Sequence, residues 1–343
     1  MPRRPTIADV AQLAGVSRAT VSFVLNNRPG VALATQQRVR SAAEELGWTP
    51  SRSARALSTG RARAVGLVLT REPELIGTDP FFPGFMAGIE TVISETGDGL
   101  MLQMSRPGDE VETYRRLAAD RRVDGVFLTD LRVDDPRPAL VTELGLPAVA
   151  VGPVEAGTDL PTVNLDDRPA VRGAVQHLVE LGHRDIAYVA GPEQFVHARR
   201  RRQAWADALA EAGLPCGPLM TGGFTAAGGA QATRALLDRR TASPTAIVYG
   251  NDLSATAGMA VAQEAGLRLP GDLSVVGFDD VPLATWTSPP LTTCRSNPVS
   301  WGRAAAQALV EVVEQGTAAD VELDPATLVI RGSTGPAPVR AAQ

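Results

Sequence analysis

The sequence predicts an all-α helix-turn-helix head at the N-terminus and an α/β body of two doubly wound parallel-sheet lobes. Three observations predict this fold class. Residues 6–46 carry helix caps and helical spacing, whereas after Arg63 short apolar strands alternate with helical stretches. The chain of 343 residues is also longer than one compact core usually needs, which favours two or more cooperating units.

The head is predicted to contain three short helices around one small core. A capping residue precedes each helix, and Gly15 suits the tight turn between the first two. The expected helices are 7–14 after Thr6, with Asp9 in its first turn, 18–25 after Ser17, and 36–46 after Thr35. The apolar residues expected to share the core are Val10, Leu13, Val16, Val21, Leu25, Val39 and Leu46.

Charge is distributed unevenly along the chain. Residues 1–63 hold ten arginines against Asp9, Glu44 and Glu45, which gives a net charge of +7. The whole chain carries −5, so residues 64–343 carry −12. A basic head on an acidic body is typical of a head that meets phosphate, and the second helix would present Arg18 to a major groove. The sequence therefore predicts binding to double-stranded DNA, with a plain helical hairpin as the alternative.

The body alternates between apolar strands and helical stretches, which is the pattern of parallel doubly wound sheets. The expected strands are 64–69, 100–104, 123–129, 147–151, 185–190, 245–249 and 273–278. The helical stretches between them include 83–96, 169–181, 198–212 and 252–265. In all, around ten strands over roughly 280 residues suit two lobes better than one, and a cleft at the carboxyl ends of the strands is where such folds bind ligands.

Composition argues against metal and membrane functions. Cys216 and Cys294 form no CxxC pair, and the three histidines lack metal-binding spacing, so we expect reduced thiols and no metal site. The sequence has no apolar run of about 18 residues, the length that would indicate a membrane-spanning helix. It also has no secretory leader, so we expect a cytoplasmic protein.

Two rival classes share the α/β pattern: an exported solute-binding protein, and a doubly wound enzyme such as a sugar kinase or dehydrogenase. The head and the missing leader oppose the first rival. The second would need a phosphate-binding P-loop or a GxGxxG turn after the first strand, and neither is present. No nucleophile–histidine–acid set stands out either, so we expect no cofactor and no catalytic residue.

Several segments together carry a family resemblance. They are TIADVAQLAGVSRATVSFVLN (6–26), ARAL (54–57), RVDGVFL (122–128), LGHRDIAYVAGP (181–192), YGNDLSATAG (249–258), LPGDLSVVGFDD (269–280) and SPPLTTCR (288–295). In this order they make the chain resemble the LacI/GalR family of transcription regulators over nearly its whole length. The resemblance implies a body built like a periplasmic sugar-binding protein.

The resemblance also implies where the domains begin and end. The helix-turn-helix DNA-binding head would span 1–49, a hinge helix and linker 50–63, and the effector-binding body 64–343. Within the body, the N-lobe would take about 64–162 and 292–321, and the C-lobe about 163–291 and 322–340.

By resemblance, Arg18 and Ala19 occupy the two base-reading positions at the start of the recognition helix. Thr20 and Ser22 would hold phosphate or base edges. Phe23 stands where the family often has arginine. It would either read one base pair by apolar contact or pack into the core of the head itself.

The family's hinge helix matches residues 51–59. Leu57 would wedge into the minor groove with Ala54 packed beside it, and such wedges kink DNA. Ser51 replaces the asparagine common at the start of this hinge, which leaves its cap and phosphate contact open. The full set of expected DNA-binding residues is Thr6, Ser17, Arg18, Ala19, Thr20, Ser22, Phe23, Asn26, Arg52, Ala54, Arg55 and Leu57.

The resemblance places a small-molecule effector between the lobes. Arg201, four residues before Trp205, matches the family's effector-binding arginine, although its register within the arginine run 199–202 is open. Asn251 follows a strand and matches an effector-facing position, with Asp252 as an alternative helix cap. The expected effector-binding residues are Phe81, Phe82, Arg201, Phe224, Asn251 and Asp279.

The remaining positions leave alternatives open. Asp279 ends a buried strand and is favoured over its neighbour Asp280 as the carboxylate of the cleft. Phe81 and Phe82 would wall the N-lobe side or belong to its core. Gly152 stands where the family often has a carboxylate, so one acceptor for a sugar hydroxyl is missing there. A sugar is still the expected effector, with a nucleoside-like molecule as the alternative.

The implied mechanism is that of an allosteric repressor. Two subunits would pair through their bodies, as a homodimer, and place two heads on a pseudo-palindromic operator. The hinge segments would fold only when paired on DNA. An effector, a sugar or sugar derivative, would close the cleft, shift the N-lobes and so change DNA affinity.

Overall fold

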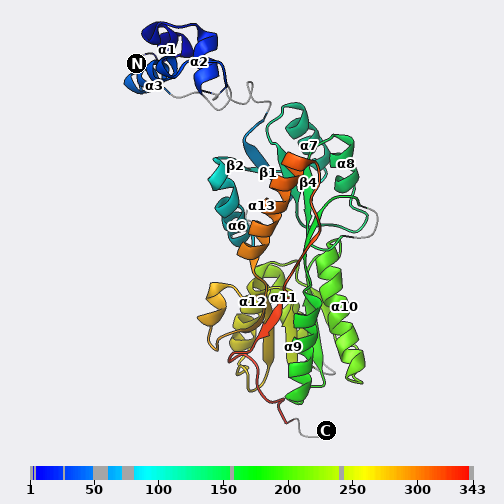
Figure 1. Cartoon of the computed structure of the whole chain (residues 1–343). Helices are drawn as coiled ribbons and strands as arrows, with labels where there is room; N and C mark the ends of the chain where they lie inside the picture. The colour runs from blue at the N-terminus through cyan, green and yellow to red at the C-terminus, as the bar shows by residue number, and fades with distance from the viewer. Residues whose placement is uncertain are drawn as a thin grey trace. The chain divides into compact units, whose positions relative to one another are not determined.

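The computed structural model describes residues 3, 5–25, 28–48, 61–71, 81–154, 158–238 and 243–339. The chain forms two compact units (Figure 1), one made of Met1–Arg63 with Arg121–Val123, and the other of the rest. Five of the predicted DNA-binding residues lie outside the described residues, and they are Asn26, Arg52, Ala54, Arg55 and Leu57.

The head contains helices α1 (Ile7–Ala14), α2 (Arg18–Leu25) and α3 (Leu33–Glu45). The predicted caps of the first two helices are confirmed. The backbone amide and the hydroxyl of Thr6 both donate to Oδ2 of Asp9, at 2.8 and 2.7 Å. Gly15 ends α1 in the left-handed conformation at φ 64°, and the hydroxyl of Ser17 accepts from the amide of Thr20 at 3.1 Å.

The third helix begins earlier than predicted. Its N-cap is Ala32, not Thr35, because the amide of Gln36 already donates to the carbonyl of Ala32 at 3.0 Å. The side chain of Gln36 supports this turn by donating to the carbonyl of Val31 at 2.9 Å. The predicted start was wrong because Thr35, although a favourable capping residue, lies within the first turn of α3 and not before it.

The core of the head follows the predicted pattern in part. Val10, Val21 and Val39 are completely buried, as predicted. Leu13 is 46% exposed and was wrongly placed in the core, because α1 buries the stripe of Val10, Ala11 and Ala14 and turns Leu13 outward. Half of the eight buried side chains of this core are alanines: Ala11, Ala14, Ala42 and Ala43.

The body contains two six-stranded sheets, which confirms the predicted fold class. The N-lobe sheet is all parallel, with the spatial order β11 (Val321–Leu323), β5 (Thr162–Leu165), β4 (Ala148–Val151), β3 (Gly125–Leu128), β1 (Ala64–Leu69) and β2 (Gly99–Met104). The C-lobe sheet has the order β12 (Thr327–Val329), β10 (Thr292–Arg295), β9 (Ser274–Asp279), β8 (Ala246–Tyr249), β6 (Ile186–Ala190) and β7 (Leu219–Thr221). Only β12 runs antiparallel to its neighbour among these described strands.

Helices cover both sheets, as doubly wound folds require. The N-lobe helices are α6 (Phe81–Thr96), α7 (Glu110–Ala119), α8 (Arg137–Glu143) and α13 (Pro298–Gln315). The C-lobe helices are α9 (Arg168–Glu180), α10 (Val196–Glu211), α11 (Ala226–Leu237) and α12 (Asp252–Glu264), with a 3-10 turn, η1, at Pro282–Thr285.

The chain passes between the lobes three times. The crossings lie between β5 and α9, between β10 and α13, and between β11 and β12. The strand β5 belongs to the N-lobe sheet as far as Leu165, and β10 belongs to the C-lobe sheet as far as Arg295. The first two crossings therefore lie a few residues further along the chain than the expected lobe boundaries, which were about 162 and 291.

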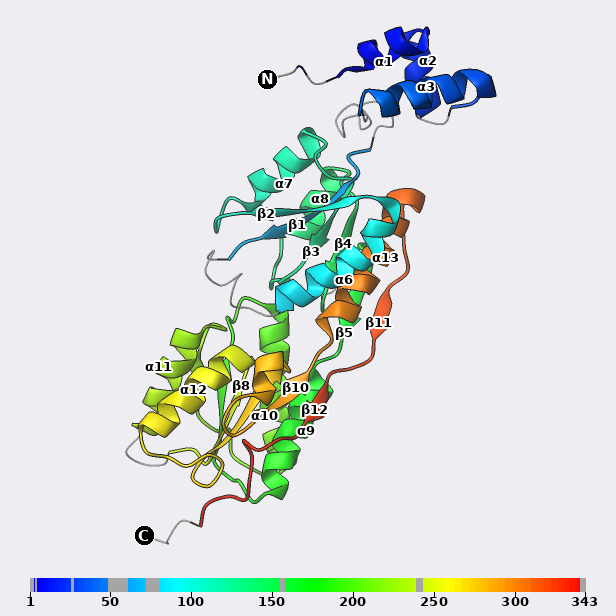
Figure 2. The same ribbon diagram turned by 90° about the vertical axis from the view of Figure 1, so that its left-hand side faces the viewer.

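Helices α6 and α13 lie side by side in both views (Figures 1 and 2) and touch through their backbones. A Cβ atom on Gly88 would lie 2.1 Å from the carbonyl oxygen of Val299, and one on Gly302 would lie 2.0 Å from that of Phe85. Only glycine fits at these two crossing points. The close approach brings Phe81, at the start of α6, against Trp301 of α13, with ring centroids 5.6 Å apart.

Candidate effector cleft and DNA-facing head

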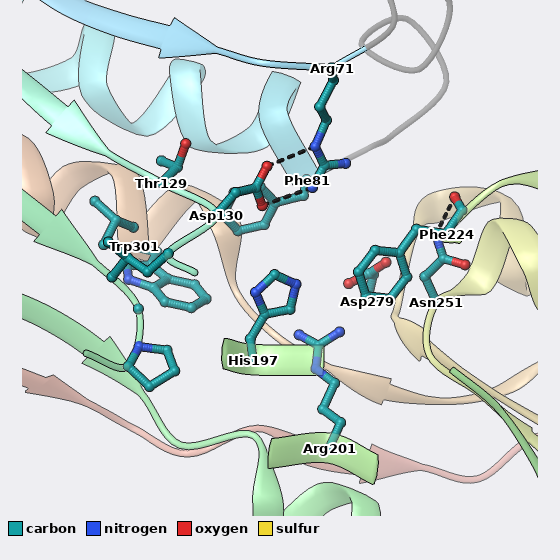
Figure 3. A pocket seen from close by; sticks show the side chains of 14 residues that line it. Arg71, Phe81, Thr129, Asp130, His197, Arg201, Phe224, Asn251, Asp279 and Trp301 are labelled. Atoms are coloured by element: carbon teal, nitrogen blue, oxygen red, sulfur yellow. Dashed lines mark hydrogen bonds and ion pairs between the residues drawn. The ribbon is translucent and has the colours of Figure 1, made fainter. Parts of the chain in front are cut away.

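A cavity that opens to solvent lies in the body where strands of both sheets end (Figure 3). Its N-lobe lining includes Arg71, Phe81, Thr129, Asp130, Gly152 and Trp301. Its C-lobe lining consists of His197, Arg201, Phe224, Asn251 and Asp279. Five of the six residues predicted to bind an effector therefore line one cavity, and the exception is Phe82.

Arg201 is the member of the arginine run that reaches this cavity. Its Nε donates to Asp167 at 2.7 Å and its Nη1 donates to the carbonyl of Gly250 at 3.1 Å. The guanidinium carbon lies 3.5 Å from the ring centroid of Phe278. Burial alone would lower the pKa of Arg201, but Asp167 and Asp279 outweigh it and raise the pKa. Arg201 is thus a fixed, charged donor in the wall.

The register of the arginine run follows from α10. Arg199 is exposed, whereas Arg200 and Arg202 turn to carboxylates outside the cavity, Asp166 at 3.8 Å and Glu193 at 3.0 Å. Arg201 lies on the buried face with Ala204 and Trp205. Because successive residues of a helix point about 100° apart, one of these four arginines, Arg201, faces the cavity.

Asn251 is both a helix cap and a residue of the cavity wall. Its Oδ1 accepts from the amide of Ser254 at 3.0 Å, and its Nδ2 donates to the carbonyl of Phe224 at 3.0 Å. The cap is therefore Asn251, and the alternative of Asp252 as the cap is wrong, because Asp252 is the first residue of α12. Asp252 instead accepts from the hydroxyl of Thr293 at 2.5 Å.

The two neighbouring aspartates at the end of β9 have separate surroundings. Asp279 lines the cavity, where its carboxylate raises the pKa of Arg201. Asp280 accepts from Arg295 and Arg331, each at 2.5 Å. Both aspartates have positive φ, 119° and 57°, so the backbone bends here and turns the two side chains to different sides.

Phe224 lies in the cleft with a backbone conformation that few non-glycine residues adopt, at φ 61°. Its ring stacks on His197, with centroids 5.6 Å apart and planes 9° apart, and His197 stacks in turn on Phe195 at 5.5 Å. A Cβ atom on Gly191 would lie 2.0 Å from the Phe224 ring. Glycine there makes room for the ring.

Phe81 and Phe82 have different places, although they are neighbours. Phe81 lines the cavity and meets Trp301 edge to face. Phe82 is completely buried, with the guanidinium of Arg71 4.9 Å from its ring centroid. The structure places Phe82 in the N-lobe core, which is the alternative that the sequence left open, because successive residues of α6 point in directions about 100° apart.

An ion pair in the cavity wall was not predicted from the sequence. Arg71, just after β1, donates from Nε and Nη2 to the two carboxylate oxygens of Asp130, at 2.7 and 2.8 Å. Burial alone would raise the pKa of Asp130, but the charge and hydrogen bonds of Arg71 outweigh it and lower the pKa. Asp130 follows a predicted strand, so the strand-end argument that found Asp279 would also have found it.

Two further wall residues, His197 and Trp301, were also missed. Burial, with the nearby charge of Arg201, lowers the pKa of His197 to about 3, so its imidazole is neutral at physiological pH. Trp301 donates from its indole nitrogen to the carbonyl of Val163 at 2.9 Å, which fixes its ring. Trp301 lies within α13 and not at the end of a strand, so only the packing of α13 on α6 could reveal it.

The head presents the start of α2 to solvent. Ser17, Arg18 and Ala19 are exposed, whereas Thr20 and Ser22 are half-buried. Phe23 is 43% exposed, and the guanidinium of Arg28 lies 5.7 Å from its ring centroid. The alternative that Phe23 packs in the core of the head is therefore wrong.

Thr6 contributes its amide and hydroxyl to the Asp9 contacts that cap α1. The hydroxyl of Ser17 caps α2 and pairs with that of Thr20 at 2.9 Å. These two predicted DNA-binding residues thus also shape the helix termini.

The described residues contain neither a candidate metal-binding cluster nor a candidate membrane-spanning helix. No cluster of three or more histidine, cysteine, aspartate or glutamate side chains with metal-binding geometry lies among them. None of their helices combines the length and the apolar character needed to cross a bilayer.

Comparisons with known proteins match both parts of the chain. Residues 6–51 match the family model of the lacI family of bacterial regulatory proteins, and residues 175–334 match that of the periplasmic binding protein-like domain. The HTH-type transcriptional regulator CelR of Thermobifida fusca is 37% identical over 94% of this chain and 95% of its own length.

Solved structures agree with these matches. A transcriptional regulator CelR–cellobiose complex superposes with a TM-score of 0.74 at 36% identity, covering 96% of this chain and 100% of the other. The lac repressor dimer bound to operator and the anti-inducer ONPF superposes with a TM-score of 0.86 at 29% identity, covering 97% and 100%.

The fold and the two sites define a class of protein: a helix-turn-helix transcriptional regulator whose body has a ligand cleft between two doubly wound lobes. The chain belongs to the lacI family of bacterial regulatory proteins.

Proposed function

We propose that this chain is a sugar-responsive transcriptional repressor. Two copies bind a pseudo-palindromic operator through their heads, and a saccharide in the cleft changes operator affinity. The observation that carries the proposal is the cavity wall. It combines the polar side chains of Arg201, Asn251 and Asp279 with the aromatic rings of Phe81 and Trp301. Sugars need both, because their hydroxyls take hydrogen bonds and their C–H faces take apolar contact.

The comparisons support a saccharide over a nucleoside-like effector. The CelR structure, at 36% identity to this chain, is a complex with cellobiose. Gly152 adds no carboxylate to the wall, but Asp130 brings one from the end of the neighbouring strand β3. A hydroxyl acceptor on the N-lobe side is therefore present at a position that the sequence did not indicate.

On the DNA side, the proposal assigns base reading to Arg18 and Ala19, at the exposed start of α2. Phe23, which is 43% exposed, adds an apolar contact to a thymine methyl group in place of an arginine–guanine contact. Residues 51–59 act as the hinge, with Leu57 as the minor-groove wedge. The lac repressor dimer on its operator supports the pairing of two heads.

The proposal includes two narrower points. The chain works as a binding protein without catalytic activity, in keeping with its relatives, which are transcriptional regulators. It acts in the cytoplasm, where the DNA that it binds is accessible.

The test uses the full chain in two assays. A thermal-shift screen compares neutral sugars, sugar phosphates and nucleosides, and a bound ligand at about 100 times its Kd should stabilise the protein by about 2.7 kcal/mol. A mobility-shift assay on DNA upstream of the chain's own gene then measures operator affinity with and without each hit. Stabilisation by nucleosides alone, or a sugar that leaves operator affinity unchanged, would contradict the proposal.

A further inference from the structure

The Arg71–Asp130 pair is built as a fixed part of the cleft. The side chains are only 10% and 18% exposed, and both line the cavity. Their contact is bidentate, at 2.7 and 2.8 Å, which fixes both planes. Asp130 has φ 50°, a conformation that non-glycine residues seldom adopt and that is often found at functional sites.

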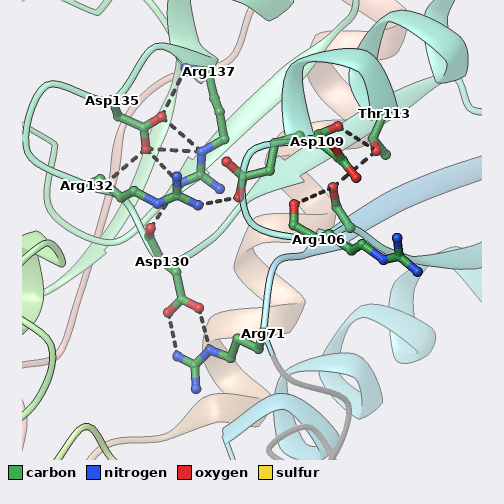
Figure 4. Close-up of polar contacts among 10 residues, drawn as sticks. Arg71, Arg106, Asp109, Thr113, Asp130, Arg132, Asp135 and Arg137 are labelled. Atoms are coloured by element: carbon green, nitrogen blue, oxygen red, sulfur yellow. Dashed lines mark hydrogen bonds and ion pairs between the residues drawn. The ribbon is translucent and has the colours of Figure 1, made fainter.

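A second layer of contacts holds the pair in place (Figure 4). Arg137 donates from Nη2 to the backbone carbonyl of Asp130 at 2.9 Å, and from Nε and Nη2 to the carboxylate of Asp135. The guanidinium of Arg71 lies against the ring of Phe82, at 4.9 Å, and of Phe195, at 5.7 Å. Side chains supported in this way hold a ligand without further ordering cost.

The cavity has two sets of charged and aromatic side chains of the kind that bind a sugar ring, one set on each lobe (Figure 3). On the C-lobe side, Arg201 and Asp279 accompany the stacked rings of Phe224 and His197. On the N-lobe side, a second charged pair, Arg71 with Asp130, accompanies the rings of Phe81 and Trp301. Each carboxylate oxygen of Asp130 receives one hydrogen bond from Arg71, and a carboxylate oxygen has a second lone pair to offer a hydroxyl.

The charged side chains of the cavity wall also favour a ligand without net charge. Arg71 and Arg201 are matched in number by Asp130 and Asp279, so the four charged side chains lining the cavity sum to zero. A phosphorylated sugar would bring at least one negative charge without a surplus cation to receive it, and burying such a charge is costly. A neutral ligand avoids this cost.

We propose that Arg71 and Asp130, with Phe81 and Trp301, form a subsite for a second sugar ring, so that the effector is a neutral disaccharide or longer saccharide. This inference rests on the proposed function, which makes the effector a saccharide. Arg71 and Asp130 are then specificity-determining residues: they distinguish a two-ring ligand from a one-ring ligand that occupies the C-lobe side.

The test is calorimetry on the full chain with glucose, cellobiose and maltose, the last two being β- and α-linked disaccharides. The variant is Arg71→Met with Asp130→Asn, which removes both charges together and leaves neither one buried alone. Asparagine accepts the positive φ of position 130, and methionine keeps an apolar stem against Phe82. A matched control is Arg268→Met with Asp272→Asn, another bidentate pair, which lies outside the cavity.

Wild-type protein should bind at least one disaccharide more tightly than glucose. The cavity variant should weaken that disaccharide by roughly tenfold or more, the loss expected for hydrogen bonds to charged groups, and should weaken glucose far less. The control should match wild type, and melting curves of all three proteins report folding.

Three results would overturn the subsite: disaccharides binding wild type no better than glucose, equal losses for both ligand sizes in the cavity variant, or no loss at all. A different result would overturn the saccharide effector itself. That result is wild-type protein that binds operator DNA but none of these sugars, while a nucleoside or a sugar phosphate stabilises it.

Discussion

Asp279 and Asp280 offer a direct test of the proposed cleft, because neighbouring residues should respond in different assays. Asparagine is the substitution of choice at both positions, since it keeps the size and tolerates the positive φ of 119° and 57°. Asp279→Asn removes a carboxylate from the cavity wall. Losing a charge-assisted hydrogen bond costs about 1.5–3 kcal/mol, so effector affinity should fall by roughly tenfold or more.

Asp280→Asn should act on stability instead. Asp280 accepts from Arg331, whose side chain is 16% exposed, and from Arg295, which is 54% exposed. Breaking a buried pair from one side costs about 3–5 kcal/mol, whereas an exposed pair contributes about 0–1 kcal/mol. For this partly exposed cluster we expect about 3 kcal/mol, which lowers the Tm of the body by roughly 5–10 °C.

The assays are calorimetry with a ligand found in the thermal-shift screen, and thermal unfolding without ligand. We expect a crossed result. Asp279→Asn should lose affinity with the smaller loss of Tm, because the buried Arg201 keeps its hydrogen-bonded partner Asp167. Asp280→Asn should lose more Tm and keep affinity when measured well below its Tm. Equal losses of affinity in both variants, or the reverse assignment, would show that the wrong carboxylate has been placed in the cleft.

Three further predictions concern the head, the hinge and the C-lobe. Because residues 1–63 carry +7, operator affinity should fall by roughly 10³-fold or more between about 50 and 200 mM salt, and a nearly flat log–log plot would exclude this head as the main contact. Leu57→Ala should weaken operator binding and reduce DNA bending in a gel phasing assay, while effector affinity stays unchanged. Burial raises the pKa of Asp252 from 3.8 to about 7, against the hydrogen bonds of Thr293 and Val281. The folded state then holds a proton that the unfolded state releases, so stability is lost as pH rises through this window, and Asp252→Asn should flatten that loss in urea unfolding series.

The elements that could be predicted from the sequence are those whose hydrophobic pattern is recognisable without their neighbours in the fold. Long apolar strands such as β1 and β9 were found because buried parallel strands are continuous apolar runs. Short strands such as β5, β7 and β11 were not, because their three or four residues are recognisable only beside a neighbouring strand. Asp279 was found by the same rule, since a polar residue directly after such a run lies at the ligand-facing edge.

The missed site residues depend on tertiary neighbours. Arg71 and Asp130 meet because β1 and β3 are adjacent in the sheet, and strand order is not readable from a single strand. Trp301 reaches the cavity through the glycine-mediated contact of α13 with α6. The choice between Phe81 and Phe82 depended on the rotation of α6, which the apolar sequence of its first turn does not fix.

The position of the cavity suggests how ligand binding reaches the rest of the body. The loop after β3 is joined to the loop before α10 and to the start of α10 by two backbone hydrogen bonds. Val133 donates to Gln194 at 3.1 Å, and Val196, the first residue of α10, donates to Leu131 at 2.9 Å. Asp130 and His197, which line the cavity, directly adjoin this junction between the lobes. A ligand that bonds both Asp130 and Arg201 gains its full free energy only in one relative position of the two lobes, and it can shift their equilibrium only by that difference. Under the proposed mechanism, a ligand confined to the C-lobe side would bind both lobe arrangements almost equally and leave operator affinity unchanged. The proposed response therefore requires a ligand that spans the cleft.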